Sequence, residues 1–231
     1  MNVIAFSAIH IRDQAHADAL SDDLWDWKRR CEHAFDRPPD MFLVERGTES
    51  FSMLSLPVIL AGIPDSKPYH CKDWSYGVAA GQAGLSHAMR CPFDLVACVC
   101  HDAILGVSLR DICREFMERP EVICGPAWHG SIDSHLVLMK REAVIDTLYS
   151  LPFMPLARIG SNAMYYEHAL TALFIARWWN PWPEIETIRM EINTPELFKG
   201  TLEDIIKWPL LSKADPATMK AYRLAHPLPL T

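Results

Sequence analysis

The sequence lacks any hydrophobic run long enough to cross a membrane. Its longest apolar stretches, such as "LPVILAGIP", are far shorter than the roughly 20 residues that a bilayer requires. It also lacks a basic block, and its formal net charge is −7, so nucleic acid is not expected as a main partner. The opening stretch "MNVIAFSAIHIRD" has neither the basic region nor the cleavage site of a signal peptide. We therefore expect it to form a strand.

The cysteines lack the spacing of a zinc site. Two of them, in "CVCH" (98–101), would share one face of a strand, but no second pair at metal-binding spacing accompanies them. The total is seven, and an odd number spread through apolar segments is typical of reduced thiols. We therefore expect buried thiols and a cytoplasmic protein.

The sequence also lacks internal repeats, low-complexity regions and clear linkers, and its 231 residues suit a single domain. Hydrophobic periodicity predicts strands that alternate with helices. Strands are predicted at 2–11, 41–45, 56–62, 93–102, 121–128 and the start of 134–148. Helices are predicted from Ser21 to about Phe35, at 72–90, 108–120, the end of 134–148, 163–179 and near 201–207. This alternation is typical of an α/β layered fold with a mainly parallel central sheet flanked by helices.

Polar side chains stand at the ends of three predicted strands. His10 ends the first, Glu45 opens the polar part of "VERGTES" after the second, and His101 and Asp102 end "FDLVACVCHD". Ligands of parallel α/β sheets bind at the carboxyl ends of the strands. "VERGTES" is therefore either an ordinary solvent-exposed turn, in which Gly47 relieves backbone strain, or the wall of a nucleotide pocket.

Four segments, in this order, resemble those of the inverting GT-A glycosyltransferases, above all the large family 2. "VERGTES" is similar to the family's "VDDGSTD", and "GVAAGQAGLSHA" is similar to its glycine-and-alanine helix, with Gln82 where asparagine is usual. "FDLVACVCHD" resembles the strand that ends in the family's D-x-D motif, and "YYEHAL" resembles the helix that carries its catalytic base. The resemblance covers about residues 1 to 179 and implies a nucleotide-diphospho-sugar transferase-like fold.

The resemblance implies a site for a nucleotide-sugar donor of the UDP or GDP type. The donor-binding residues would be His10, Glu45, Gly47, Gln82, His101 and Asp102. The D-x-D motif is incomplete, because either Cys100 replaces its first acid or Ala103 replaces its last. A divalent cation, Mn²⁺ or Mg²⁺, would be held by Asp102 and His101, since Mn²⁺ accepts imidazole as well as carboxylate ligands.

The resemblance also implies a catalytic base that takes the proton from the acceptor, a glycan or another hydroxyl compound. His168 matches the family's base by position, and histidine side chains titrate near neutral pH. Glu167 is the alternative, because it matches better chemically but lies one residue earlier. Asp133 and His135, in the polar stretch "WHGSIDSH", would line the acceptor side.

These expectations describe an inverting, metal-assisted, hexosyltransferase-type enzyme that moves a sugar from a nucleotide-diphosphate donor to an acceptor hydroxyl. Residues 1–105 would form its nucleotide-binding half, 106–180 its acceptor-side half and 181–231 a C-terminal extension. The incomplete D-x-D leaves open a degenerate GT-A domain that binds nucleotide or glycan without catalysis. A nucleotidyltransferase ranks third, because "SAIHIRDQ" has no glycine-rich, basic loop to hold a triphosphate.

Overall fold

The computed structural model describes most of the first 150 residues and two short segments beyond them. The described residues are 1–9, 11, 13–35, 37–45, 56–61, 74–101, 104–105, 109–120, 122–125, 127–128, 131–132, 136–150, 192–193 and 210–211. The helices predicted at 163–179 and near 201–207 lie outside them. Within this part of the chain, every helix is too short or too polar to cross a membrane.

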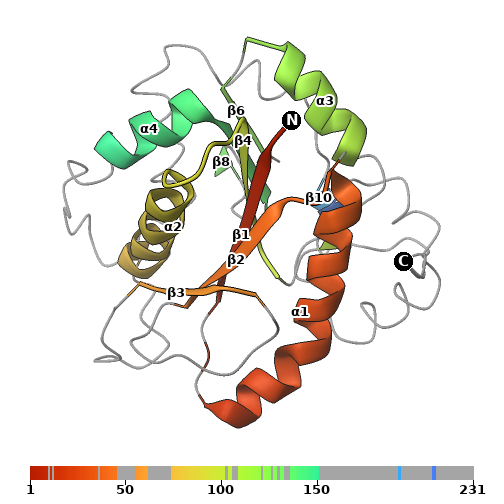
Figure 1. Ribbon diagram of the computed structural model, residues 1–231, viewed down its shortest axis with the longest axis vertical. Helices are drawn as coiled ribbons and strands as arrows, with labels where there is room; N and C mark the ends of the chain where they lie inside the picture. The colour runs from red at the N-terminus through yellow and green to blue at the C-terminus, as the bar shows by residue number, and fades with distance from the viewer. Residues whose placement is uncertain are drawn as a thin grey trace.

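Strands and helices follow one another along the chain (Figure 1). The first elements are β1 (Val3–Ile9), α1 (Gln14–Ala34), β2 (Asp40–Glu45), β3 (Val58–Leu60), α2 (Trp74–Ala88) and β4 (Leu95–Val99). The later elements are β5 (Ile104–Leu105), α3 (Leu109–Glu118), β6 (Ile123–Cys124), β7 (Ala127–Trp128), β8 (Ser131–Ile132), β9 (Leu136–Lys140), α4 (Arg141–Ser150), β10 (Ile192–Asn193) and β11 (Leu210–Leu211).

The central sheet has six strands in the order β3-β2-β1-β4-β9-β6. The first four strands in this order are parallel to one another. β9 is antiparallel to both β4 and β6, so the sheet is mixed. Two small sheets, β10-β11-β5 and β7-β8, accompany it. The predicted α/β fold with a mainly parallel sheet is confirmed, with β9 as the reversed strand.

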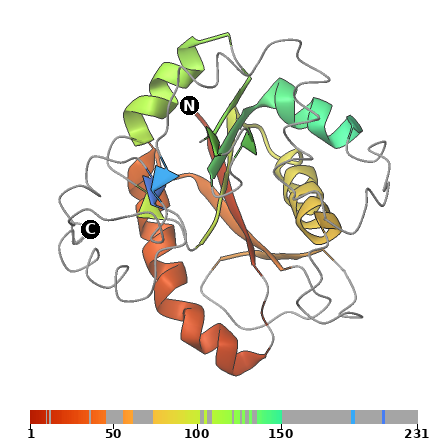
Figure 2. The same cartoon turned by 180° about the vertical axis from the view of Figure 1, so that it is seen from behind.

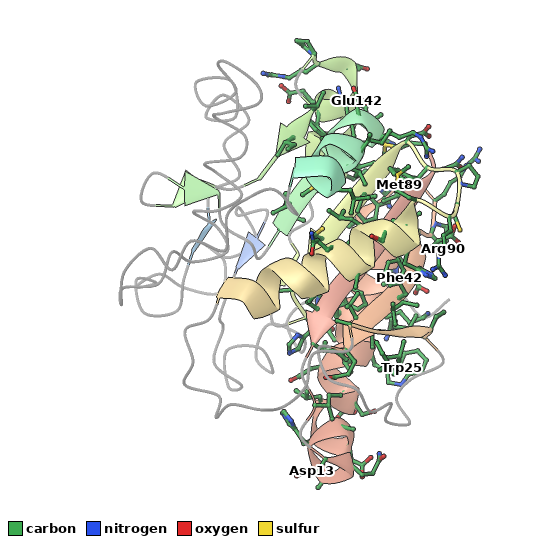
Figure 3. The ribbon with its side chains drawn as sticks, turned by 90° about the vertical axis from the view of Figure 1, so that its left-hand side faces the viewer. Asp13, Trp25, Phe42, Met89, Arg90 and Glu142 are labelled. Atoms are coloured by element: carbon green, nitrogen blue, oxygen red, sulfur yellow. The ribbon has the colours of Figure 1, made fainter. Side chains whose placement is uncertain are left out.

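In the described part of the chain, α1 and α3 cover one face of the central sheet, and α2 and α4 cover the other (Figures 1 and 2). On the α1 face, α1 and α3 contribute Trp27 and Phe116 to one buried cluster. On the α2 face, α2 and α4 contribute Leu85 and Val144 to a second cluster. Successive residues of a strand point to opposite faces, which is why a strand covered on both faces, such as β1, is apolar on both apart from Ser7. Figure 3 looks onto the α2 face, where α2 and α4 lie in front of the strands.

The first helix begins earlier than its hydrophobic pattern predicts. The sequence predicts a start at Ser21, but α1 begins at Gln14 and is capped by Asp13. The Asp13 carboxylate accepts a hydrogen bond from the backbone N–H of His16 at 2.8 Å, the usual role of aspartate before a helix. Only Ala17 is buried in the first two turns, because this end of α1 extends beyond the sheet (Figure 3). Apolar spacing therefore could not mark the true start.

Several predicted strands are also shorter in the structure. The predictions at 2–11, 56–62 and 93–102 correspond to β1, β3 and β4, which are shorter at both ends. The prediction at 121–128 is divided into β6 and β7, next to Pro126, which has no backbone N–H to donate to a neighbouring strand. One consequence matters for the site: His101 follows β4 instead of ending it.

Arg110, on α3, binds backbone carbonyl groups at the C-terminal end of α1. Its Nη2 donates to the carbonyl of His33 at 2.6 Å and to that of Phe35 at 3.3 Å. The last carbonyls of a helix have no partner within the helix. The contact therefore satisfies two backbone acceptors and joins the two helices of the α1 face.

The glycine-and-alanine helix α2 packs very closely on β1. A Cβ placed on Gly84 would lie 2.8 Å from Cδ2 of Phe6 and still closer to Cε2 and Cζ. The Phe6 ring stacks on Phe42 with the ring centroids 5.2 Å apart, and His87 meets Phe42 edge-on at 4.7 Å. Only glycine leaves room for this ring beneath the helix.

Candidate functional site at the carboxyl edge of the sheet

Two of the predicted site residues lie at the same carboxyl edge of the central sheet, on the two sides of β1. Glu45 is the last residue of β2 and pairs with Ile9, the last residue of β1. On the other side of β1, the pairing with β4 extends to Phe6 and Cys98. His101 lies two residues beyond the end of β4, outside the paired part of the strand.

The strand order also marks where a ligand would bind. After β1 the chain builds β2 and β3 on one side, and it then crosses to β4 on the other side of β1. The connections therefore diverge at the carboxyl ends of β1 and β4. Open α/β sheets bind their ligands in the crevice outside such a switch point. Ile11, after β1, and His101, after β4, stand beside this position.

Glu45 is a buried acid with defined partners. Only 2% of its surface is exposed, and its Oε2 accepts a hydrogen bond from the backbone N–H of Ile11 at 3.1 Å. Its own carbonyl accepts a bond from the N–H of Ala61 at 2.8 Å, just after β3. Glu45 therefore joins the segment after β1 to the segment after β3. Its predicted contact with the donor stays a prediction.

His101 is half-buried and follows Cys100 directly after β4. Its neighbour Cys98 is partly exposed as a residue, but its thiol packs with the core of the α2 face. Burial raises the pKa of Cys98 to about 12. These apolar surroundings favour the interpretation of Cys98 as a buried thiol over the zinc interpretation of "CVCH".

Gln82 lies in the middle of α2 and is partly buried. At 1.5 Å per residue, it is about 12 Å along the helix axis from Trp74, where α2 begins. It lies on the α2 face, whereas alternation along β2 places the Glu45 side chain with Leu43 on the α1 face. The described residues therefore separate Gln82 from Glu45 by the thickness of the sheet.

The other predicted site residues lie outside the residues that the structure describes. They are His10, Gly47, Asp102, Asp133, His135, Glu167 and His168. Within the described ranges, no three His, Cys, Asp or Glu side chains gather into a metal-binding group. A metal site would therefore depend on Asp102, and its residues remain predictions.

Sequence reasoning missed the part that Ile11 plays at this edge. We assigned residue 11 to the first strand, but β1 ends at Ile9 and the Ile11 amide binds a side chain instead of a neighbouring strand. The signal was an acid ending the apolar run of β2. A buried carboxylate requires hydrogen-bond donors, and an amide of the adjacent connection is an available one.

The strand order defines an α/β fold whose connections diverge between β1 and β4. Neither a protein-family model nor a curated protein sequence matches the chain. A solved structure of similar fold is a glycosyltransferase involved in the glycosylation of the major capsid of PBCV-1. Its TM-score is 0.50, with 10% identity over 97% of this chain and 98% of that one. This likeness shows the fold.

A second solved structure is the apo form of the glycosyltransferase GlyE from Streptococcus pneumoniae TIGR4. It has a TM-score of 0.48 and 9% identity, over 93% of this chain and 55% of that one. The chain thus spans about half of that structure, and we base the fold assignment on the first match alone.

Proposed function

We propose that the protein is a glycosyltransferase that uses a nucleotide-diphosphate sugar, of the UDP or GDP type, and is inverting and of the GT-A type. The observation that supports this most is the position of Glu45 and His101. Glu45 ends β2 and His101 follows β4 at the same edge of the sheet, beside the switch point of a sheet whose fold is shared with a glycosyltransferase. The order of the four family-like segments, which extends beyond the described residues, adds support.

The proposed reaction needs two groups that the sequence offers. The acceptor hydroxyl must lose a proton as it attacks the anomeric carbon, and a base positioned beside it accelerates this step. We assign the base to His168, with Glu167 as the alternative. The departing nucleoside diphosphate carries negative charge, which must be stabilised as its bond to the sugar breaks.

A divalent cation fits the donor set that we propose for this edge. Asp102 would supply a carboxylate oxygen and His101 an imidazole nitrogen, a combination that suits Mn²⁺. His101 is half-buried and only one strand away from the end of β1, so it stands where a diphosphate would lie. When bound, the cation would neutralise charge on the leaving diphosphate.

Cys100 favours one second candidate, a GT-A domain that binds nucleotide or glycan without catalysis. If Asp102 is the last acid of the D-x-D motif, Cys100 occupies the place of the first acid, and if His101 holds the first place, Ala103 occupies the last. Either way the site has one carboxylate fewer than the family pattern. Metal-dependent hydrolysis of a nucleotide sugar would distinguish the two functions, because a binding domain would release no free sugar.

We expect UDP or GDP with Mn²⁺ to raise the melting temperature of the protein. A ligand at 100 times its Kd stabilises the folded state by about 2.7 kcal/mol, which is roughly 5–10 °C for a chain of this size. The matching nucleoside monophosphate is the control, since it lacks the diphosphate that the cation would bridge. If no nucleotide changes the melting temperature with or without metal, the proposed function is wrong.

Asp102→Asn should weaken metal-dependent binding of the nucleoside diphosphate much more than it weakens folding. The amide keeps the shape of the carboxylate but not its charge, which hard cations require. We expect the Kd for the nucleoside diphosphate, measured by calorimetric titration with Mn²⁺, to rise at least about 10-fold, because loss of an outer-shell partner alone has an effect of this size. Asp111→Asn, an exposed acid on α3, is the matched control. Equal affinities for wild type and Asp102→Asn would remove Asp102 from the metal site.

A further inference from the structure

The Glu45 carboxylate is directed to the backbone after β1. Its Oε2 lies 3.1 Å from the Ile11 nitrogen, and both residues are buried, with 2% and 3% of their surfaces exposed. A hydrogen bond to a charged acceptor is stronger than one between neutral groups. Leaving a buried carboxylate without a donor is unfavourable. The two groups therefore hold each other in place.

Among the described residues, three attachments hold the connection between β1 and α1, and this bond is one of them. The connection starts at Ile9, which is fixed by its pairing with Glu45 in the sheet. It is held in the middle by the Ile11 amide. It ends at Asp13, whose carboxylate caps α1 through the N–H of His16. Glu45 supplies two of the three attachments, one through its backbone and one through its side chain.

The connection held in this way borders the proposed donor crevice, whereas Glu45 itself is one strand further away. The switch point lies between β1 and β4, and β2 is on the opposite side of β1. An effect of Glu45 on a ligand at the switch point would therefore pass through the backbone of the β1–α1 connection.

We propose that Glu45 is a positioning residue for the nucleotide donor, which acts by holding the β1–α1 connection through the Ile11 amide instead of by touching the nucleotide. This inference rests on the proposed function. In this role Glu45 would not contact the donor directly, as the resemblance implies, but would preorganise the backbone of the β1–α1 connection. Preorganisation of this backbone lowers the conformational entropy that is lost when the nucleotide binds.

The test compares Glu45→Ala, which removes the acceptor, with Glu45→Gln, which keeps an acceptor oxygen but removes the charge. Hydrogen–deuterium exchange at the Ile11 amide reports directly whether this amide is still bound by the side chain of residue 45. The Kd for UDP or GDP with Mn²⁺ reports its effect on the donor site. Asp40→Ala is the matched control, because Asp40 is an exposed acid at the other end of the same strand. Amide protection at Val96 and Leu138, in the paired centre of the sheet, confirms that each variant is folded.

We expect Glu45→Ala to accelerate exchange at the Ile11 amide and to raise the Kd for UDP or GDP, each by roughly 10-fold. This is the effect of losing one hydrogen bond to a charged group. Glu45→Gln should restore both values to within about threefold of the wild type. Asp40→Ala should change neither.

Two results would overturn the positioning role while leaving the proposed function standing. One is a Glu45→Gln protein that keeps Ile11 protected but loses affinity by 10-fold or more, since that would mean direct contact through the charge. The other is unprotected Ile11 in Glu45→Ala with unchanged affinity. If Glu45→Ala does not fold, the affinity of Glu45→Gln for the nucleoside diphosphate alone tests the positioning role. A wild-type protein that binds no nucleoside diphosphate overturns the proposed function, and this inference with it.

Discussion

Gly84→Ala is expected to lower the free energy of unfolding by about 1–2 kcal/mol, although alanine favours helices over glycine by about 1 kcal/mol. The new methyl carbon would lie within 2.8 Å of three carbons of the Phe6 ring, closer than non-bonded carbon atoms approach. The ring is buried, with 2% exposed, and is stacked on Phe42, so it has little room to move. Inserting carbon atoms into a packed core typically costs 1–3 kcal/mol, enough to outweigh the gain in helix propensity.

Denaturant-induced unfolding of two further proteins would show whether the Phe6 ring is the cause. Ser86→Ala changes an exposed residue of the same helix and should leave stability the same or slightly higher. In a Phe6→Leu background, Gly84→Ala should be tolerated much better, because the smaller side chain leaves room for the methyl group. A double-mutant cycle measures this coupling. If Gly84→Ala is as stable as the wild type, the close packing of α2 on β1 is wrong.

His168→Ala is expected to reduce the turnover of sugar transfer by about 10²–10⁴-fold, the usual effect of removing a general base. The assignment follows from the position of His168 in "YYEHAL". In a helix, the adjacent side chains of Glu167 and His168 would point about 100° apart, so only one of them would reach the acceptor hydroxyl. Glu167→Gln should therefore retain most of the turnover.

The measurement compares both variants with the wild type at saturating donor, after a donor and an acceptor have been identified. Binding of the nucleoside diphosphate should be unchanged in both, because the base acts on the acceptor. If His168→Ala keeps its turnover while Glu167→Gln loses it, the acid is the base. If neither variant changes the rate, the helix is only a structural part of the core.

Much of the fold could be predicted from the sequence, because its elements are determined by local patterns. The strand at 41–45 was predicted almost to the residue, since β2 spans Asp40–Glu45. The helix at 72–90 was also predicted, and α2 spans Trp74–Ala88 within it. The predicted boundaries were wrong where the local pattern does not reflect the structure. The exposed first turns of α1 have no stripe of apolar residues that would mark the start of the helix at Gln14.

The candidate site could be predicted only in part. Polar residues at the ends of apolar strands identified Glu45 and His101 as residues of the carboxyl edge, and the structure has Glu45 at the end of β2 and His101 just after β4. The catalytic assignments, and Asp102 of the metal assignment, rest on residues outside the described part of the chain, and all of these roles stay predictions. The sequence did not predict that the Glu45 carboxylate binds the Ile11 amide. A buried acid requires a donor, but its sequence does not say which of many amides will provide it.

The sequence by itself determined roughly where the main strands and helices of the described part of the chain lie. It also determined that polar residues such as Glu45 and His101 stand at or just after the ends of apolar strands, because both properties depend on residues close together in the chain. The tertiary structure alone decided the direction of β9, whose five residues are all buried and would have the same apolar pattern in either direction. It also decided the partner of Glu45, which lies 34 positions away in the chain. Register and strand order bring such distant groups together, and they are properties of the assembled sheet.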